Sequence, residues 1–246
     1  MRRKPAGRLR QIADAAVTVL SRQGYRLTQM ADVARECGLS AGALYGYVES
    51  KEAMLHLALA HAFGMALDEA TLPYRIASPE EPLNLLKREI KRAAVWPVLS
   101  ERMRDGIRLR PDDLSLVAGE LFDVMHGRRR SVWLLDRCAQ DIPEIAALYV
   151  KQVKARYLDD LAAFLAAGQA QGLFHRDLDP AIAARALLEM IAWLAMHRLR
   201  DVLPLPADED QVRRAAVSLV THAVSASTGR AVNASSANRP GRRRQA

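Results

Sequence analysis

The sequence predicts an all-α protein. Half of its 246 residues are hydrophobic but only 5% are aromatic, and the strong helix formers leucine and alanine recur throughout. Apolar residues return every three or four positions, and no segment alternates apolar and polar residues as a half-buried strand would. At roughly 150 residues per domain, the length corresponds to about 1.6 domains, enough for a small module and a larger one.

The first two predicted helices lie near the N-terminus. Residues 9–22 place apolar side chains at helical spacing, namely Leu9, Ile12, Ala13, Ala16, Val19 and Leu20. Gly24, just beyond them, is the expected C-cap. Thr28 is the expected N-cap of a second helix, because its hydroxyl can bind a free backbone N–H, and Gly38 ends that helix.

A very short third helix is expected from Ala41 to about Gly46. Ser40 caps its start and Leu44 is its core residue. Because only Gly38 and Leu39 separate it from the preceding helix, the two predict a helix-turn-helix over residues 28–47.

A long helix is expected after Ser50, its predicted N-cap, and it ends before Pro73 after passing through Leu55, Leu59, Phe63 and Leu67. Residues 71–82 are rich in helix breakers, so we place the junction of two domains there. We therefore expect a first domain over residues 8–70 and a helical second domain over 83–226. Its helices are predicted over 83–96, 98–105, 111–127, 131–138, 143–172, 180–200 and 210–226.

Positive charge is concentrated at the two ends of the chain. The formal net charge is +8, and residues 1–10 and 225–246 each carry +5 without any acid, so residues 11–224 carry −2. A basic segment can neutralise nucleic-acid phosphates or can be a solvated tail. We expect the first role for the flexible arm at residues 1–10 and plain disorder for residues 227–246.

The sequence also indicates a compartment. No apolar run approaches the ~20 residues of a transmembrane helix. The first apolar segment is interrupted by Gln11 and Asp14, so it cannot serve as a signal-peptide core. We expect a cytoplasmic protein whose two cysteines, Cys37 and Cys138, are reduced core residues, with a redox-sensing pair as the alternative.

The most specific signal lies between residues 8 and 55. It consists of Ile12, Ala15, Ala16, Gly24, Tyr25, Thr28, Val33, Ala34, Gly38, Leu39, Ser40, Leu44, Tyr45, Gly46, Tyr47, Ser50, Lys51, Glu52 and Leu55. In this order they resemble the DNA-binding domain of the TetR family of bacterial transcription repressors. Three positions depart from the family pattern: Leu27 stands where Thr is usual, Val48 where Phe is usual, and Gly46 weakens a helix end.

The resemblance implies phosphate contacts for Thr28, Tyr45, Tyr47 and Lys51. A hydroxyl, two phenols and an ammonium group are suitable donors to phosphate oxygens. The alternative for each tyrosine is an ordinary packed aromatic.

Small residues at the start of the third helix also suit DNA binding. Ala41, Gly42 and Ala43 permit close approach to a major groove about 12 Å wide. None of them can form a bidentate bond to a base. Base readout is therefore expected from Gln29, Ser40, a backbone contact or the Ala43 methyl against thymine, with help from DNA shape.

The predicted DNA-binding segment carries little positive charge of its own. Residues 26–58 have a net charge of −1. Helix N-termini and the arm with Arg2, Arg3 and Lys4 must then supply much of the attraction. We expect a steep dependence of affinity on salt that falls when these three residues are removed.

Residues 143–224 look like the C-terminal part of the same family, which dimerises and encloses a small-molecule pocket. Small residues allow helices to pack closely, either in a two-fold four-helix bundle or, alternatively, within a monomer. Two predicted helices are rich in them: one carries Ala155, Ala162, Ala163, Ala166, Ala167 and Ala170, and the other carries Ala181, Ala183, Ala184, Ala186 and Ala192. A homodimer would hold two heads about 34–36 Å apart on a pseudo-palindromic operator.

Bulky residues on the intervening helices are candidates for contacts with an effector of unknown identity. They are Trp96, Met103, Phe122, Met125, His126, Trp133 and Tyr149. The alternative for each is ordinary core packing. The resemblance implies that the ligand favours a conformation whose head spacing no longer fits the operator, so that a repressor releases its DNA.

The sequence raises two other classes of function, an enzyme and a helical interaction scaffold. His175–Leu178 copies the H-R-D-L start of a kinase catalytic loop, but Ile182 stands where the metal-binding Asn would be, and there is no glycine-rich phosphate loop. An interhelical loop with Asp179 as N-cap and Pro180 at the first helical position is the better interpretation. The histidines form no metal motif, so we expect no enzyme, metal or cofactor. A helical interaction scaffold remains the alternative function.

Overall fold

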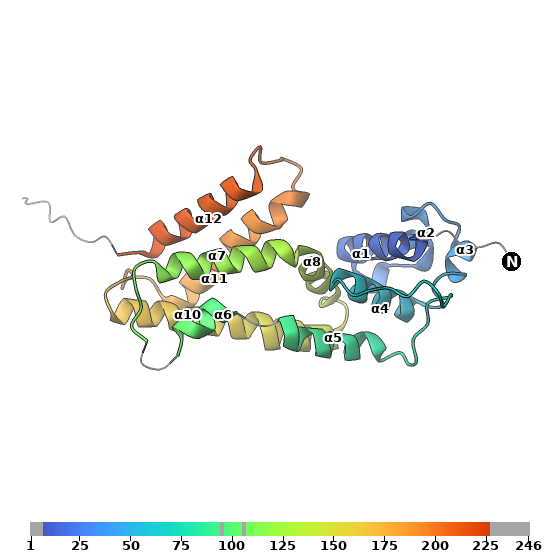
Figure 1. Cartoon of the computed structure of the whole chain (residues 1–246), viewed down its shortest axis with the longest axis horizontal. Helices are drawn as coiled ribbons and strands as arrows, with labels where there is room; N and C mark the ends of the chain where they lie inside the picture. The colour runs from blue at the N-terminus through green and yellow to red at the C-terminus, as the bar shows by residue number, and fades with distance from the viewer. Residues whose placement is uncertain (1–6, 94–95, 105–106, 227–246) are drawn as a thin grey trace, which may run out of the picture.

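The computed structural model describes residues 7–93, 96–104 and 107–226 and consists of helices and their connections (Figure 1). Across this part of the chain, the only β features are two isolated bridges, one between Val48 and Tyr74 and one between Phe174 and Ser225. The predicted all-α fold is confirmed. The helices are α1 (Arg8–Leu27), α2 (Met30–Glu36), α3 (Ala41–Tyr45), α4 (Lys51–Ala62), α5 (Glu81–Ala93), α6 (Pro97–Arg102), α7 (Asp113–Gly127), α8 (Arg129–Cys138), α9 (Pro143–Ile145), the π-helix η1 (Ala146–Ala155), α10 (Arg156–Ala170), α11 (Pro180–Ala195), the 3-10 helix η2 (His197–Arg200) and α12 (Glu209–Val224).

Two of the predicted helix starts are held by the expected caps. The Ser40 hydroxyl accepts a hydrogen bond from the Ala43 N–H at 3.2 Å, and the Ser50 hydroxyl accepts one from the Ala53 N–H at 3.1 Å. Each bond satisfies one of the N–H groups that a first helical turn leaves free.

The predicted extent of the fourth helix is wrong. α4 ends at Ala62, so Leu67 lies outside it. Gly64 adopts φ 76°, and the N–H groups of Gly64 and Met65 donate to the carbonyls of His61 and Ala60 at 3.0 and 2.9 Å. This is the Schellman arrangement, which uses the left-handed backbone that glycine tolerates to end a helix.

A break near the end of α1 separates its regular part from the segment that leads to α2. Gly24 has φ 82° and ψ 175° inside the helix, so the predicted end of regular helix at this residue is confirmed. Few residues other than glycine adopt this conformation. The break redirects residues 25–29 toward the helix-turn-helix.

Buried residues form two hydrophobic cores. The first joins α1–α4 with residues of α5, α8 and η1, including Leu86, Leu135 and Tyr149. The second joins α6, α7, α10, α11 and α12, with Phe122 and Phe164 among its largest side chains. Helix α8 packs against α1 and lies at the junction between the N-terminal helices and the rest (Figure 1).

The breaker-rich connection 71–82 docks onto the end of the helix-turn-helix. The Tyr74 N–H donates to the Tyr47 carbonyl at 2.7 Å, and the Glu49 N–H donates to the Tyr74 carbonyl at 3.2 Å. Val48, between these bonds, is fully buried in the first core. The valine at this position is therefore accommodated by packing beneath the connection.

The H-R-D-L sequence is a loop, as expected. Residues 175–178 lie between α10 and α11, where the Asp179 carboxylate accepts from the Ile182 N–H at 2.9 Å and Pro180 begins the helix. The single helix expected over 143–172 is in fact α9, η1 and α10 in succession, with π-helical hydrogen bonding in the middle. No helix of the described ranges is both long and apolar enough to cross a membrane.

Candidate functional site: nucleic-acid interface and cavity

Helix α3 presents its first turn outward at the end of the molecule where the chain begins (Figure 1). Ser40, Ala41, Gly42, Ala43 and Tyr45 are exposed, whereas the Leu44 side chain is fully buried and anchors the helix. A Cβ built on Gly42 meets no atom within 4 Å. A flat face of small side chains with one exposed phenol thus lies on a fixed support, which suits close approach to another surface.

The predicted role of Thr28 as N-cap is wrong. Gln29 is the N-cap of α2, and its backbone N–H donates to the Asp32 carboxylate at 2.9 Å. Thr28 is fully buried, and its hydroxyl donates to the Gly24 carbonyl at 2.5 Å. Because that hydroxyl bonds inward, it does not face a phosphate in this arrangement. Gln29 is exposed beside it.

The other two predicted phosphate contacts are half-buried. The Lys51 ammonium donates to the Arg26 carbonyl at 3.3 Å and lies 4.5 Å from the centre of the Tyr25 ring. Tyr47 packs against the first core. Tyr47 lies in the segment that joins α3 to α4, and Lys51 is the first residue of α4, so both follow the exposed α3 face closely in the sequence.

The basic arm is only partly described. Arg3 and Lys4 lie outside the described residues, whereas Arg8 and Arg10 belong to α1. The Arg8 guanidinium donates to the Gln11 side chain at 2.6 Å and to the Cys37 carbonyl at 3.0 Å. Arg8 therefore ties the start of α1 to the turn between α2 and α3.

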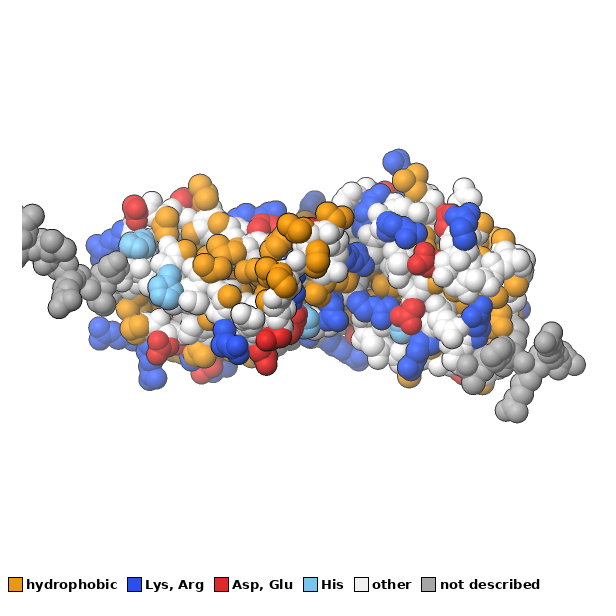
Figure 2. Space-filling model, turned by 90° about the horizontal axis from the view of Figure 1, so that it is seen from above, with side chains coloured by type: hydrophobic (Ala, Val, Ile, Leu, Met, Phe, Trp, Pro, Cys, Tyr) orange, Lys and Arg blue, Asp and Glu red, His pale blue; other side chains and the backbone are white. Residues whose placement is uncertain are grey.

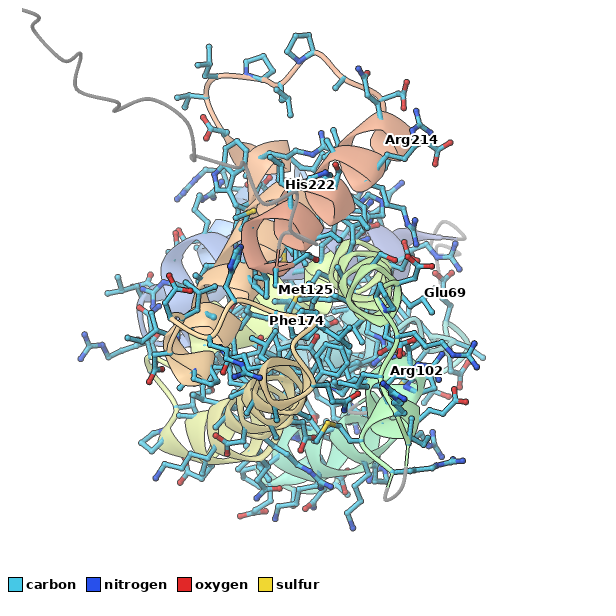
Figure 3. All side chains as sticks on the ribbon, turned by 90° about the vertical axis from the view of Figure 1, so that its left-hand side faces the viewer. Glu69, Arg102, Met125, Phe174, Arg214 and His222 are labelled. Carbon is cyan, nitrogen blue, oxygen red and sulfur yellow. The ribbon has the colours of Figure 1, made fainter. Side chains whose placement is uncertain are left out.

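A cavity of about 80 Å³ lies between the two cores. This is several times the roughly 10–15 Å³ that one water needs. Trp96, Met125 and Tyr149, three of the seven predicted ligand residues, line it, and Figure 3 shows Met125 near the middle of the helical assembly. The remaining lining residues are Phe63, Ile90, Val124, Arg128, Ser131, Val132, Leu135, Asp136, Val153, Lys154, Tyr157, Leu188, Glu189, Ala192, Met196 and His197.

These lining residues come from separate helices, and sequence inspection missed most of them. One signal was present: positions 131, 132, 135 and 136 form a stripe at helical spacing along α8. A stripe of this kind shows that the residues share a face. It does not show that the face borders empty space.

Several polar side chains, among them Asp136 and Lys154, interrupt the apolar wall of the cavity. Asp136 lies 3.9 Å from the Lys154 ammonium, and burial raises the pKa of its carboxyl group despite the nearby Lys154 and the hydrogen bond from Tyr149. Burial also raises the pKa of the Tyr149 phenol, so this group stays protonated. Tyr157 packs on Trp96 with ring centres 4.1 Å apart, and its buried hydroxyl has no hydrogen-bond partner among the described residues.

Four predicted ligand residues lie away from the cavity wall. Phe122 is a core residue and stacks on His126, whose Nδ1 lies 2.7 Å from the Glu209 carboxylate. Met103 packs against the second core. The Arg200 guanidinium lies over the Trp133 ring, with its Cζ 3.6 Å from the centre of the ring.

The cysteines do not form a disulfide. Both are free, Cys138 is fully buried, and Cys37 is only partly buried. Burial raises the pKa of the Cys138 thiol to about 12, which disfavours the reactive thiolate. Within the described ranges, no cluster of three or more His, Cys, Asp or Glu residues is placed to hold a metal ion.

Two family models match this chain. The model of bacterial regulatory proteins of the tetR family matches residues 12–58, which contain α2, α3 and most of α1 and α4. The model of the tetracyclin repressor-like C-terminal domain matches residues 111–196, which contain the helices from α7 to α11. The chain belongs to the TetR family. The helix-turn-helix therefore falls in the first matched region, and the part of the cavity wall between Val124 and Met196 falls in the second.

Two uncharacterised HTH-type transcriptional regulators of Bacillus subtilis (strain 168) are similar to parts of this TetR-family chain. YerO is 29% identical over 80 residues, which cover 32% of this chain and 28% of YerO. YfiR is 31% identical over 113 residues, which cover 45% of this chain and 47% of YfiR. The matched parts thus span less than half the length of either relative.

Solved structures share the TetR-family fold. The ketosteroid transcriptional regulator KstR2 of Mycobacterium tuberculosis has a TM-score of 0.52 and 18% identity, covering 91% of this chain and 97% of KstR2. The TetR-family member SCO3833 of Streptomyces coelicolor A3 has a TM-score of 0.51 and 18% identity, covering 86% of this chain and 87% of SCO3833.

Proposed function

We propose that this protein is a homodimeric, ligand-responsive transcriptional regulator that binds a pseudo-palindromic operator and is released from it by a small molecule. The observation that carries the proposal is the exposed first turn of α3, held on the buried Leu44 and preceded by α2. This is the arrangement in which a recognition helix enters a major groove. The main alternative, a helical scaffold protein, leaves this exposed face without a role.

Contacts to DNA are assigned by exposure and chemistry. Ser40, Ala41, Gly42 and Ala43 approach the base edges, with Gln29 beside them, and the Tyr45 phenol, which is 52% exposed, binds a phosphate. Tyr47, between α3 and α4, and Lys51, the first residue of α4, add phosphate contacts. Arg3 and Lys4 of the arm contribute charge, which predicts that affinity falls steeply with salt.

A second copy of the chain would cover the outer face of α11 and α12. Ile182 and Trp193 of α11 are 72% and 43% exposed, and Leu219 of α12 is 55% exposed. Figure 2 shows hydrophobic side chains gathered on this side of the molecule, toward its middle. Large exposed apolar side chains on adjacent helices favour a self-complementary interface. Helix α10, the other alanine-rich helix, packs on α11 within the same chain.

The effector would occupy the cavity between the cores. Its lining is largely aromatic and aliphatic, with Asp136, Lys154 and His197 on the wall. The buried Tyr157 hydroxyl would gain a partner from a polar atom of the ligand, which favours binding because an unsatisfied buried donor is costly. We assign the protein to the cytoplasm and give it no catalytic role.

A footprint of the purified protein on the DNA upstream of its own gene tests the proposal. We expect a protected two-fold site that is lost in a Tyr45→Ala, Lys51→Ala variant. A Leu116→Ala variant, altered at an exposed residue of α7, is the control and keeps the footprint. Absence of sequence-specific protection at low and moderate salt would favour the scaffold alternative.

A further inference from the structure

Helix α8 belongs to both the cavity and the interface with the helix-turn-helix. Ser131, Val132, Leu135 and Asp136 line the cavity from one side of this helix. Arg130, in its first turn, pairs with Asp14 of α1. Arg137, the neighbour of Asp136 in the chain, points to the far end of α1. Adjacent residues of one helix therefore face the cavity and the DNA-binding region.

The last turn of α8 and the residues just after it bind the last turn of α1 at two points. The Arg137 guanidinium donates to the Gln23 carbonyl at 2.7 Å, and the Asp141 carboxylate accepts from the Arg26 N–H at 2.9 Å. Arg137 and Asp141 pair with each other at 3.7 Å. We refer to Arg137 and Asp141 as the clamp.

Gly24 lies between the two gripped residues, and its lack of a side chain makes the clamp possible. A Cβ at this position would overlap the Asp141 carboxylate and would lie 2.8 Å from the Arg137 Cζ. Such short separations require the neighbouring groups to move. Glycine at position 24 thus permits both the break in α1 and the close approach of Arg137 and Asp141.

The clamped segment is bonded in turn to the DNA-binding helices. Thr28, immediately before the N-cap of α2, donates to the Gly24 carbonyl, and Lys51 at the start of α4 donates to the Arg26 carbonyl. The Tyr25 hydroxyl donates to the Glu52 carboxylate at 3.2 Å. A displacement of residues 23–26 would therefore shift the starts of both α2 and α4.

We infer that the Arg137–Asp141 clamp transmits filling of the cavity to the helix-turn-helix, by moving residues 23–26 with the last turn of α8. The inference deepens the proposed function and rests on it for its DNA readout. A ligand that pushes on Leu135 or Asp136 displaces α8, and Arg137, the next residue of α8, is bonded to α1. Arg137 and Asp141 are positioning residues in this scheme and touch neither ligand nor DNA.

The ligand is unidentified, so the test fills the cavity with larger side chains instead. These substitutions are placed on helices other than α8. Ala192 of α11 and Val124 of α7 both line the cavity, so Ala192→Phe and Val124→Phe are two independent fillers. Each is combined with R137Q and D141A together, which remove the bonds to Gln23 and Arg26 without changing the net charge. R213Q is the control, because Arg213 pairs with Asp123 between α12 and α7, at 2.6 Å, outside the clamp.

Operator affinity of the whole 246-residue chain is measured by fluorescence anisotropy on the footprinted duplex at one salt concentration. Allosteric coupling is typically about 5- to 150-fold, so we expect a filler to weaken binding at least about fivefold. The same filler changes affinity less than about twofold in the clamp variant and keeps its full effect with R213Q. Circular dichroism and thermal melting identify a filler that does not fold, in which case the other filler is used.

Hydrogen exchange provides a readout that requires no DNA. A filler should speed amide exchange in residues 24–36 of the wild-type background and add nothing in the clamp variant. The inference is overturned if both fillers leave exchange and affinity unchanged, or if their effects persist undiminished without the clamp. Failure of the wild-type footprint would instead contradict the proposed function, while exchange would still decide whether the clamp couples the two regions.

Discussion

The Thr28 hydroxyl donates to the Gly24 carbonyl at 2.5 Å, and this buried bond joins the break in α1 to the start of α2. Thr28→Val keeps the shape of the side chain but leaves the carbonyl without this donor. We expect the free energy of unfolding to fall by roughly 1–3 kcal/mol, the usual effect of an unsatisfied buried group. Urea denaturation measures it, with Thr28→Ser as the control that keeps the hydroxyl. Equal stability of the valine variant and wild type would contradict this role.

Two glycines should respond in opposite ways to alanine. Gly24 has φ 82° and is crowded by Asp141 and Arg137, whereas Gly42 is helical and has open space around its Cβ position. We expect Gly24→Ala to destabilise the protein by roughly 1–3 kcal/mol through backbone strain. Gly42→Ala should be neutral or stabilise it by up to about 1 kcal/mol, because alanine favours the helix. Thermal melting of both variants decides; similar melting temperatures would argue against the strain at Gly24.

The hydrogen bonds of the Asp14 carboxylate predict that the folded protein loses stability in acid. Partial burial would raise the pKa of its carboxyl group, but hydrogen bonds from His61 and Arg130 outweigh burial and hold the pKa below 3.8. A carboxylate with a lowered pKa stabilises the folded state above its unfolded pKa, and this contribution is lost as pH falls through and below 3.8. We expect the stability difference between wild type and Asp14→Asn to be largest near pH 7 and to narrow below pH 4. Urea titrations at several pH values measure it, and a difference independent of pH would refute the assignment.

The outer face of α11 and α12 predicts the oligomeric state. Leu219→Arg places a charge on the apolar face that we assign to the second copy, where a desolvated charge opposes association. We expect sedimentation equilibrium to give a dimer for the wild type and a monomer for this variant. Val150→Arg is the matched control, because Val150 is a 39% exposed apolar residue on η1. A Leu219→Arg dimer as strong as wild type would place the interface elsewhere.

Features that depend on contacts within a few residues were predictable from the sequence. Ser40, Ser50 and Asp179 cap helices through bonds to the backbone N–H three positions later, and Gly38 follows α2 with φ 67°. Such bonds form within one turn of the chain, so residue type and position indicated these three caps. The helical periodicity of the apolar residues likewise predicted most of the helices and the helix-turn-helix.

Contacts between distant segments were decided by the tertiary structure. Thr28 has the chemistry of an N-cap, but packing buries it and directs its hydroxyl to Gly24. Residues of several helices form the wall of the cavity. Asp136 lines this cavity and Arg137 binds α1 because α8 is packed between the cavity and α1. Helical spacing defines which residues share a face, whereas the burial and partners of that face depend on how the helices assemble. The sequence alone therefore determined most of the helices, the caps at Ser40, Ser50 and Asp179, and the family, and the assembly determined the cavity, the clamp and the partner of Thr28.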